Sequence, residues 1–228
     1  MLITILFVVA LIFSAIIHEY AHGWVAYKLG DHTAEDAGRL TLNPLAHLDP
    51  IGSVLVPLLL VLSKTGFFIA WAKPVPYNPY NLRDPKYGDL KVALGGPGSN
   101  LLLAIFMGLF ARVLPLATDL KLTLAQSVLF SDGDAALSLI HGNPLAAMYL
   151  LAGVICFVNL ALMLFNLIPI PPLDGSKILL PFLSHRNQMR FHQLSNYGFM
   201  LIFILAYLGA FNLIIIPLVY GFSFLMGA

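Results

Sequence analysis

Apolar residues dominate long stretches of this chain, and four of these stretches match or exceed the roughly 20 residues that a helix needs to cross a bilayer. They are residues 3–27, 91–113, 145–167 and 197–221. A fifth apolar stretch, 51–72, is interrupted by the polar turn Ser63-Lys64-Thr65-Gly66, which would be costly at the middle of a membrane. The pattern predicts an all-α polytopic membrane protein with four full transmembrane helices and a re-entrant hairpin at 51–72. Five or six spans are the alternatives.

Loop charges favour the hairpin over a full crossing at 51–72. With a hairpin, most lysines and arginines lie on one side of the membrane, and only Arg112 and Lys121 lie opposite. A full crossing distributes them more evenly. Because cytoplasmic loops carry an excess of Lys and Arg, the crowded side is predicted to be cytoplasmic and the N-terminus external. The residues on the crowded side are Lys28, Arg39, Lys73, Arg83, Lys86, Lys91, Lys177, Arg186 and Arg190.

Composition supports a membrane protein and excludes some functions. The chain is 59% hydrophobic and 10% charged, whereas an ordinary soluble domain is about 25% charged. A formal net charge of +1 without a basic cluster argues against nucleic-acid binding. The single cysteine, Cys156, lies in an apolar run and offers neither a disulfide framework nor a cysteine-type zinc site. We expect one membrane domain, 1–228, without a cleaved signal peptide, because no basic residues precede the first apolar run.

The segments between the predicted spans are short and partly irregular. Alternating residues at 39–42 predict a small membrane-associated strand that could hold an extended substrate, and the prolines that follow prevent a continued helix. Residues 73–90 are predicted to form a proline-rich surface loop, and 114–144 have the mixed polarity of an interfacial helix.

The first predicted span contains the sequence His18-Glu19-Tyr20-Ala21-His22. Two histidines at positions i and i+4 share one face of a helix and can bind one zinc ion, with the intervening glutamate beside them as a general base. Ionisable groups within a membrane are costly unless they are paired or bound to a metal. The motif therefore predicts a zinc hydrolase that works within a bilayer, with His18 and His22 as metal ligands and Glu19 as the base.

A catalytic zinc site normally has three protein ligands, and Asp174 is the best third candidate. It follows Pro169, Pro171 and Pro172, which must unwind the end of the span at 145–167 and leave the aspartate free to turn inward. In the hairpin topology, the helices 3–27 and 145–167 run in the same direction, so Asp174 and the histidines reach the same half of the membrane. The alternative is that Asp174 only caps a helix at 176–183.

Three separate motifs resemble the site-2 protease family of intramembrane metalloproteases. They are HEYAH at 18–22, GGPGSN at 95–100 and NLIPIPPLDG at 166–175, and residues 43–52 are similar to the compact bacterial branch without PDZ or CBS domains. The resemblance implies that one zinc ion is bound by His18, His22 and Asp174, and that Glu19 activates water. It also implies that Asn166 lies in the active site near the scissile carbonyl.

The predicted reaction is hydrolysis of peptide bonds within or near transmembrane segments of membrane proteins, in a bacterial cytoplasmic membrane, with the site toward the cytoplasmic half. An ion or solute transporter and an inactive zinc-binding scaffold remain alternatives. Asn166 has two interpretations, an oxyanion donor or a cap of the broken helix. His47 and Asp49 are expected to stabilise their own loop. Gly95, Gly96 and Gly98 are expected to allow close helix packing, with Asn100 bonding across helices.

Overall fold

The computed structural model describes the whole chain except residues 1, 48, 50–54, 56–58, 60–72 and 210–211. Among the described residues there is no strand, and most belong to helices. Three helices are long and apolar enough to cross a membrane: α1 (Leu2–Lys28), α5 (Gly88–Val113) and α8 (Pro144–Asn166). They match the predicted spans at 3–27, 91–113 and 145–167, so these three segments are confirmed as helices with the length and composition of membrane spans.

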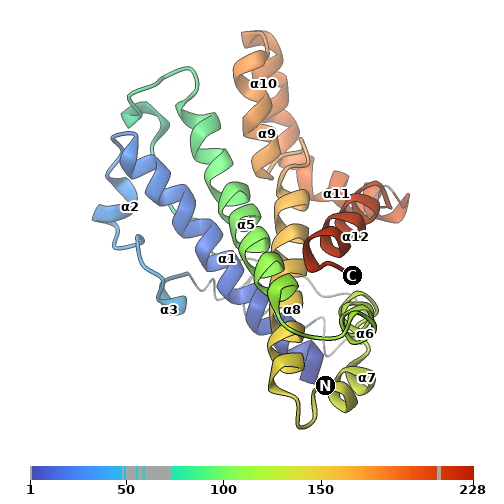
Figure 1. Ribbon diagram of the computed structural model, residues 1–228. Helices are drawn as coiled ribbons and strands as arrows, with labels where there is room; N and C mark the ends of the chain where they lie inside the picture. The colour runs from blue at the N-terminus through green and yellow to red at the C-terminus, as the bar shows by residue number, and fades with distance from the viewer. Residues whose placement is uncertain (1, 48, 50–54, 56–58, 60–72, 210–211) are drawn as a thin grey trace.

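The three long helices pack against one another as a bundle. Helices α1 and α8 run in the same direction, and α5 runs antiparallel to both (Figure 1). The C-terminal ends of α1 and α8 therefore lie at the same end of the bundle as the start of α5. This arrangement allows residues late in α1 to meet the segment that follows α8.

Local sequence explains where α8 begins and ends. The side chain of Asn143 accepts a hydrogen bond from the backbone N–H of Ala146 at 3.1 Å, and Pro144 occupies the first helical position. The helix ends at Asn166, shortly before the prolines at 169, 171 and 172. A proline cannot donate to a helical carbonyl and disfavours helical geometry in the residue before it, so the chain must leave the helix here.

The predicted fourth span at 197–221 is wrong as a single helix. Its residues form two shorter helices, α11 (Gly198–Tyr207) and α12 (Asn212–Met226). Gly209 has a φ angle of 74°, a left-handed conformation that glycine adopts readily and that ends a helix. Apolar composition alone does not reveal such a break. Helix α12 packs against α5, α6 (Thr118–Leu129) and α8.

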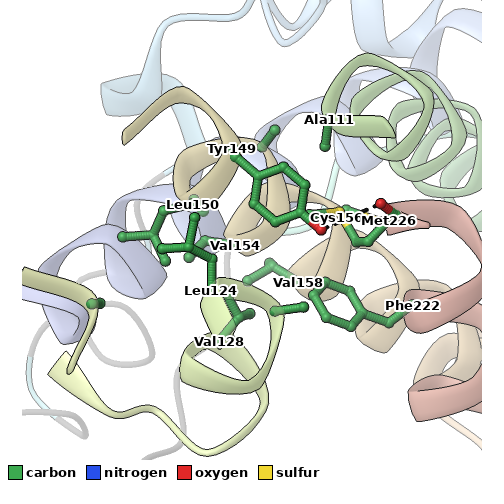
Figure 2. Packing of buried hydrophobic residues seen from close by; sticks show 14 of the residues in the cluster. Ala111, Leu124, Val128, Tyr149, Leu150, Val154, Cys156, Val158, Phe222 and Met226 are labelled. Atoms are coloured by element: carbon green, nitrogen blue, oxygen red, sulfur yellow. Dashed lines mark hydrogen bonds between the residues drawn. The ribbon is translucent and has the colours of Figure 1, made fainter. Parts of the chain in front are cut away.

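A buried hydrophobic core joins α5, α6, α8 and α12 (Figure 2). The core includes Tyr149 and Leu150 of α8, Leu124 of α6, and Phe222 and Met226 of α12. Their side chains are at most 1% exposed. This core fixes the position of α8 in the bundle.

The remaining described elements are short. One interfacial helix was predicted in 114–144, and two helices are found there, α6 and α7 (Gly133–Ile140). The others are α2 (Thr33–Asp36), α3 (Pro44–His47), η2 (Pro79–Asn81), α9 (Asp174–Leu179), η3 (Leu180–Phe182), α10 (His185–Leu194) and η4 (Ser195–Tyr197). The predicted hairpin at 51–72 falls almost entirely outside the described residues.

The predicted strand at 39–42 is not found, because these residues are irregular. The buried side chain of Arg39 instead donates to the carbonyl of Lys73 at 2.7 Å. The nearby Asp31 is fully buried and accepts hydrogen bonds from the backbone N–H of Asn78 at 2.7 Å and the amide of Asn81 at 2.9 Å. These contacts tie the chain after α1 to the segment 73–81 and bring that segment over the end of α1.

Candidate metal centre

Two histidines of α1 and one aspartate of α9 meet in the half of the bundle nearer the C-terminal end of α1. The Nε2 atoms of His18 and His22 are 3.0 Å apart, and each lies 3.1 Å from the Oδ2 atom of Asp174. His18 and Asp174 are buried, and His22 is half-buried. The structure thus brings together the three residues predicted as metal ligands, although Asp174 lies 152 positions after His22.

The segment after α8 aims Asp174 at the histidines. Helix α9 begins at Asp174, and its N-cap residue is Leu173, which makes no side-chain cap. The Asp174 carboxylate instead contacts both histidines of α1, so Asp174 is not the helix cap that the alternative interpretation required. Gly175 is needed for this path, because a Cβ atom there would lie 2.3 Å from the carbonyl oxygen of Leu167.

Helix α5 leaves room for the two imidazoles through a glycine. A Cβ atom on Gly96 would lie 2.4 Å from Nε2 of His22 and 2.6 Å from Nε2 of His18. A Cβ atom on Gly95 would lie 3.0 Å from the carbonyl oxygen of Ala21, so this pair lets α5 approach α1 closely. The prediction of close packing is confirmed for Gly95 and Gly96 and is wrong for Gly98, where an added Cβ atom would meet no neighbouring element within 4 Å. Gly96 additionally borders the Nε2 atoms of both histidines.

Each imidazole has its second nitrogen bound by a neighbouring helix. Nδ1 of His22 lies 2.7 Å from the carbonyl oxygen of Val92, which can only accept, so this nitrogen carries a hydrogen. Nδ1 of His18 lies 2.6 Å from Oδ1 of Asn100, which confirms that Asn100 bonds across helices. With hydrogen on Nδ1, the lone pair of a neutral imidazole is on Nε2, the atom that faces Asp174.

The chemistry of these three atoms fits a metal ion. Two imidazole lone pairs and a carboxylate oxygen converge within 3.1 Å, and such acceptors repel one another unless a cation or shared protons lie between them. Nitrogen and oxygen donors about 2 Å from one zinc ion lie about 3.3 Å apart in a tetrahedron, which is close to the distances here. Two histidines and one carboxylate are also a ligand set that catalytic zinc sites use.

The predicted base, Glu19, lies on α1 between the two histidines in sequence. Its Oε2 atom accepts a hydrogen bond of 2.9 Å from the backbone N–H of Val75. Val75 is buried in the extended segment between Pro74 and Pro76. This backbone contact, which sequence reasoning missed, holds the carboxylate in one orientation.

The other predicted residues have more local contacts. Asn166 donates from Nδ2 to the carbonyl of Leu162 at 3.0 Å, as expected for a side chain that binds its own helix. His47 is buried, and its Nε2 lies 2.8 Å from the carbonyl oxygen of Thr41, so it stabilises its loop as predicted.

Sequence reasoning also missed a buried polar chain beside the histidines. Asn100 donates to Oδ1 of Asn159 in α8, and Asn159 donates to the hydroxyl of Ser14 in α1, each at 2.8 Å. The only signal in the sequence was the presence of isolated polar residues within apolar helices, which does not say which residues meet.

Comparison with known proteins identifies the family. The model of peptidase family M50 matches residues 6–208. The "Putative zinc metalloprotease YwhC" of Bacillus subtilis (strain 168) is 38% identical over 199 residues, which cover 87% of this chain and 78% of that protein. The "Putative zinc metalloprotease Rip2" of Mycolicibacterium smegmatis is 28% identical over 222 residues, covering 96% of this chain and 73% of that protein.

A further relative, Rip2 of Mycobacterium tuberculosis (strain H37Rv), is 29% identical over 175 residues, covering 77% of this chain and 56% of that protein. No solved structure matches the chain. The family match covers most of the chain, including both histidines, Glu19 and Asp174. The chain therefore belongs to peptidase family M50, the site-2 protease family of intramembrane zinc metalloproteases.

Proposed function

We propose that His18, His22 and Asp174 hold the zinc ion of this intramembrane metalloprotease and that Glu19 is its general base. The observation that carries the proposal is the convergence of both Nε2 atoms on one carboxylate oxygen, at 3.1 Å each. Such a cluster in a membrane bundle is costly unless a cation neutralises it. Family membership supplies the reaction class, peptide-bond hydrolysis.

Zinc bound there would polarise the scissile carbonyl and lower the pKa of a bound water from about 16 to about 7. Glu19 takes the proton of the attacking water and passes it to the nitrogen of the leaving amine. The N–H of Val75 holds one carboxylate oxygen of Glu19, which limits the orientations that the base can adopt. Helix α1 positions the two histidines and α9 positions Asp174, while residues of α5 bind the second nitrogen of each imidazole.

Asn166 is proposed as a donor to the developing oxyanion. Its side chain donates to the carbonyl of Leu162, and an amide nitrogen carries a second hydrogen that can donate to a substrate. Loss of one oxyanion donor typically costs about 3 kcal/mol of transition-state stabilisation. We expect Asn166→Ala to lower kcat while zinc binding is retained.

The proposed substrates are membrane proteins with a transmembrane segment that unwinds locally. At 1.5 Å per residue, His18 lies about 24 Å from the start of α1 and about 15 Å from its end at Lys28. The site is thus in the half of the bilayer nearer the end of α1. The loop charges support a cytoplasmic assignment of this half, in a bacterial cytoplasmic membrane. The strand at 39–42 is absent, so strand addition there forms no part of the proposal.

Two other functions would need different observations. An ion or solute transporter has no requirement for two histidines and an aspartate around one point, and a peptidase family does not favour it. A structural zinc site has four protein ligands, whereas three possible ligands meet here among the described residues.

One experiment tests the proposal against both alternatives. The full chain is purified in detergent, its zinc content per chain is measured, and it is incubated with transmembrane test substrates beside the Glu19→Gln variant. We expect one zinc per chain in both proteins and cleavage only by the wild type. A transporter would hold no stoichiometric zinc, and a scaffold would hold zinc but cleave nothing.

A further inference from the structure

A continuous buried hydrogen-bond chain leads from His18 through three helices. Nδ1 of His18 binds Oδ1 of Asn100 in α5, and Asn100 binds Asn159 in α8. Asn159 in turn binds the hydroxyl of Ser14 at 2.8 Å and the carbonyl of Ile155 at 2.8 Å. Both asparagines are 0% exposed. Burial of two amides is costly, and the residue of the metal centre that they reach is His18, so we look for their role through His18.

The direction of every hydrogen bond in this chain follows from the carbonyl of Ile155. A backbone carbonyl can only accept, so the atom of Asn159 beside it must be the amide nitrogen. The oxygen of Asn159 then faces Asn100, which must present its own nitrogen there. This nitrogen also lies 3.5 Å from the carbonyl oxygen of Ser14, a second group that can only accept.

The remaining atom of Asn100, its oxygen, must therefore face His18. Because that oxygen can only accept, Nδ1 of His18 must carry a hydrogen. The lone pair of the neutral ring is then on Nε2, which points to His22 and Asp174. His22 also has its hydrogen on Nδ1 and its lone pair on Nε2, because its Nδ1 contacts the carbonyl oxygen of Val92 directly, without an intervening amide.

We propose, on the basis of the zinc site proposed above, that Asn100 and Asn159 are positioning residues for His18. In this relay the Ile155 carbonyl orients the amide of Asn159, and Asn159 orients the amide of Asn100. Asn100 then holds His18 in the zinc-binding tautomer, with the hydrogen on Nδ1. Asn100 without Asn159 is held weakly, because the Ser14 carbonyl lies 3.5 Å from its nitrogen, and an amide that turned over would present this nitrogen to the ring. Asn159 prevents this turn, since its own orientation is held by Ile155. Residues that orient metal-binding histidines typically change metal affinity by 10- to 100-fold when they are replaced.

The relay makes a specific prediction for a pair of substitutions. Asn159→Leu releases the amide of Asn100, which can then turn, and zinc affinity should fall by about 10-fold or more. In the double variant Asn159→Leu/Asn100→Asp, a carboxylate replaces that amide and presents an oxygen to His18 in either orientation. The second substitution should therefore recover most of the lost affinity. A role in packing alone predicts that the two losses add.

The test is a zinc titration of the full chain in detergent, in competition with a chelator of known affinity. The single and double variants are compared with wild type, Asp174→Ala and the control Tyr149→Phe, which removes a buried hydrogen bond of α8 outside the relay. The proposal is overturned if Asn159→Leu binds zinc as tightly as wild type, or if the double variant binds no more tightly than the single one. If wild type and Asp174→Ala bind zinc equally, the zinc site itself is wrong and the relay falls with it.

A measurement on the wild type keeps the proposal testable if a variant does not fold. Nitrogen NMR of zinc-loaded protein labelled at histidine should show His18 with a slowly exchanging hydrogen on Nδ1, and with zinc on Nε2. A His18 ring that binds zinc through Nδ1, or that lacks the Nδ1 hydrogen, would overturn the relay.

Discussion

The substitution Gly96→Ala should separate helix stability from metal binding. Gly96 lies within α5, and alanine in a helix interior is normally more favourable than glycine by about 1 kcal/mol. At this position, however, the added methyl group would point at the two imidazoles. It would lie 2.4 Å from Nε2 of His22 and 2.5 Å from Cε1 of His18.

The size of the effect follows from these distances. Non-bonded heavy atoms are most stable at about 3.5–4.0 Å, so both rings or the helix must move by about 1 Å. Displacement of a catalytic group by 1 Å can lower the rate by about 100-fold. The zinc-binding nitrogens are the atoms displaced, so zinc affinity should fall as well, by about 10-fold or more.

The matched control is Gly98→Ala in the same helix and motif, where no atom lies within 4 Å of an added Cβ. Zinc affinity, cleavage of a transmembrane substrate and the thermal midpoint are measured for both variants. We expect Gly98→Ala to keep all three or gain slightly in stability, and Gly96→Ala to lose zinc affinity and activity. Wild-type zinc affinity and cleavage in Gly96→Ala would refute the geometry described for the site.

Three further predictions concern the surroundings of the site. Val75→Pro removes the N–H that holds Glu19 and should lower kcat by about 10-fold with zinc content unchanged, whereas Val75→Ala keeps this N–H and should retain more activity. Asp31→Ala should lower the free energy of unfolding by about 1–3 kcal/mol at neutral pH, because donors including Thr33 and Asn81 lose their acceptor. Burial raises the pKa of Asp31, but the hydrogen bonds outweigh burial and lower this pKa in the folded state. The stabilisation is therefore complete above the ordinary pKa of about 3.9, and it is lost as the pH falls through the lower pKa of the folded state. Thermal unfolding of wild type and variant between pH 7 and pH 2 checks this, and a difference that grew on acidification would contradict it. Removal of zinc by a chelator should abolish cleavage, and added zinc should restore it in the wild type but not in Asp174→Ala.

Sequence patterns predicted the residues that are constrained locally. His18 and His22 share a helix face because of their spacing, and three prolines force the chain out of α8 before Asp174. The apolar stretches located α1, α5 and α8 because length and hydropathy suffice to define a span. The same criterion failed at 197–221, where the conformation of one residue, Gly209, breaks an otherwise uniform apolar run.

Contacts between distant residues were less accessible to sequence analysis. The alternation at 39–42 predicted a strand, but the side chain of Arg39 binds the carbonyl of Lys73 instead. The Asn100–Asn159 contact joins residues 59 positions apart, and the pattern of either helix alone gives no partner for these amides. Such pairs depend on helix rotation and packing, which a hydropathy pattern does not specify.

X-ray absorption at the zinc edge of the purified protein is the most direct test of the proposed zinc site. We expect one zinc ion bound by two imidazole nitrogens and by oxygen donors, at about 2.0–2.2 Å. When Asp174→Ala is loaded with excess zinc, the loss of one oxygen donor relative to wild type would identify Asp174 as that ligand. A zinc ion with a sulfur ligand, with a single imidazole, or with the same surroundings in wild type and Asp174→Ala would contradict it.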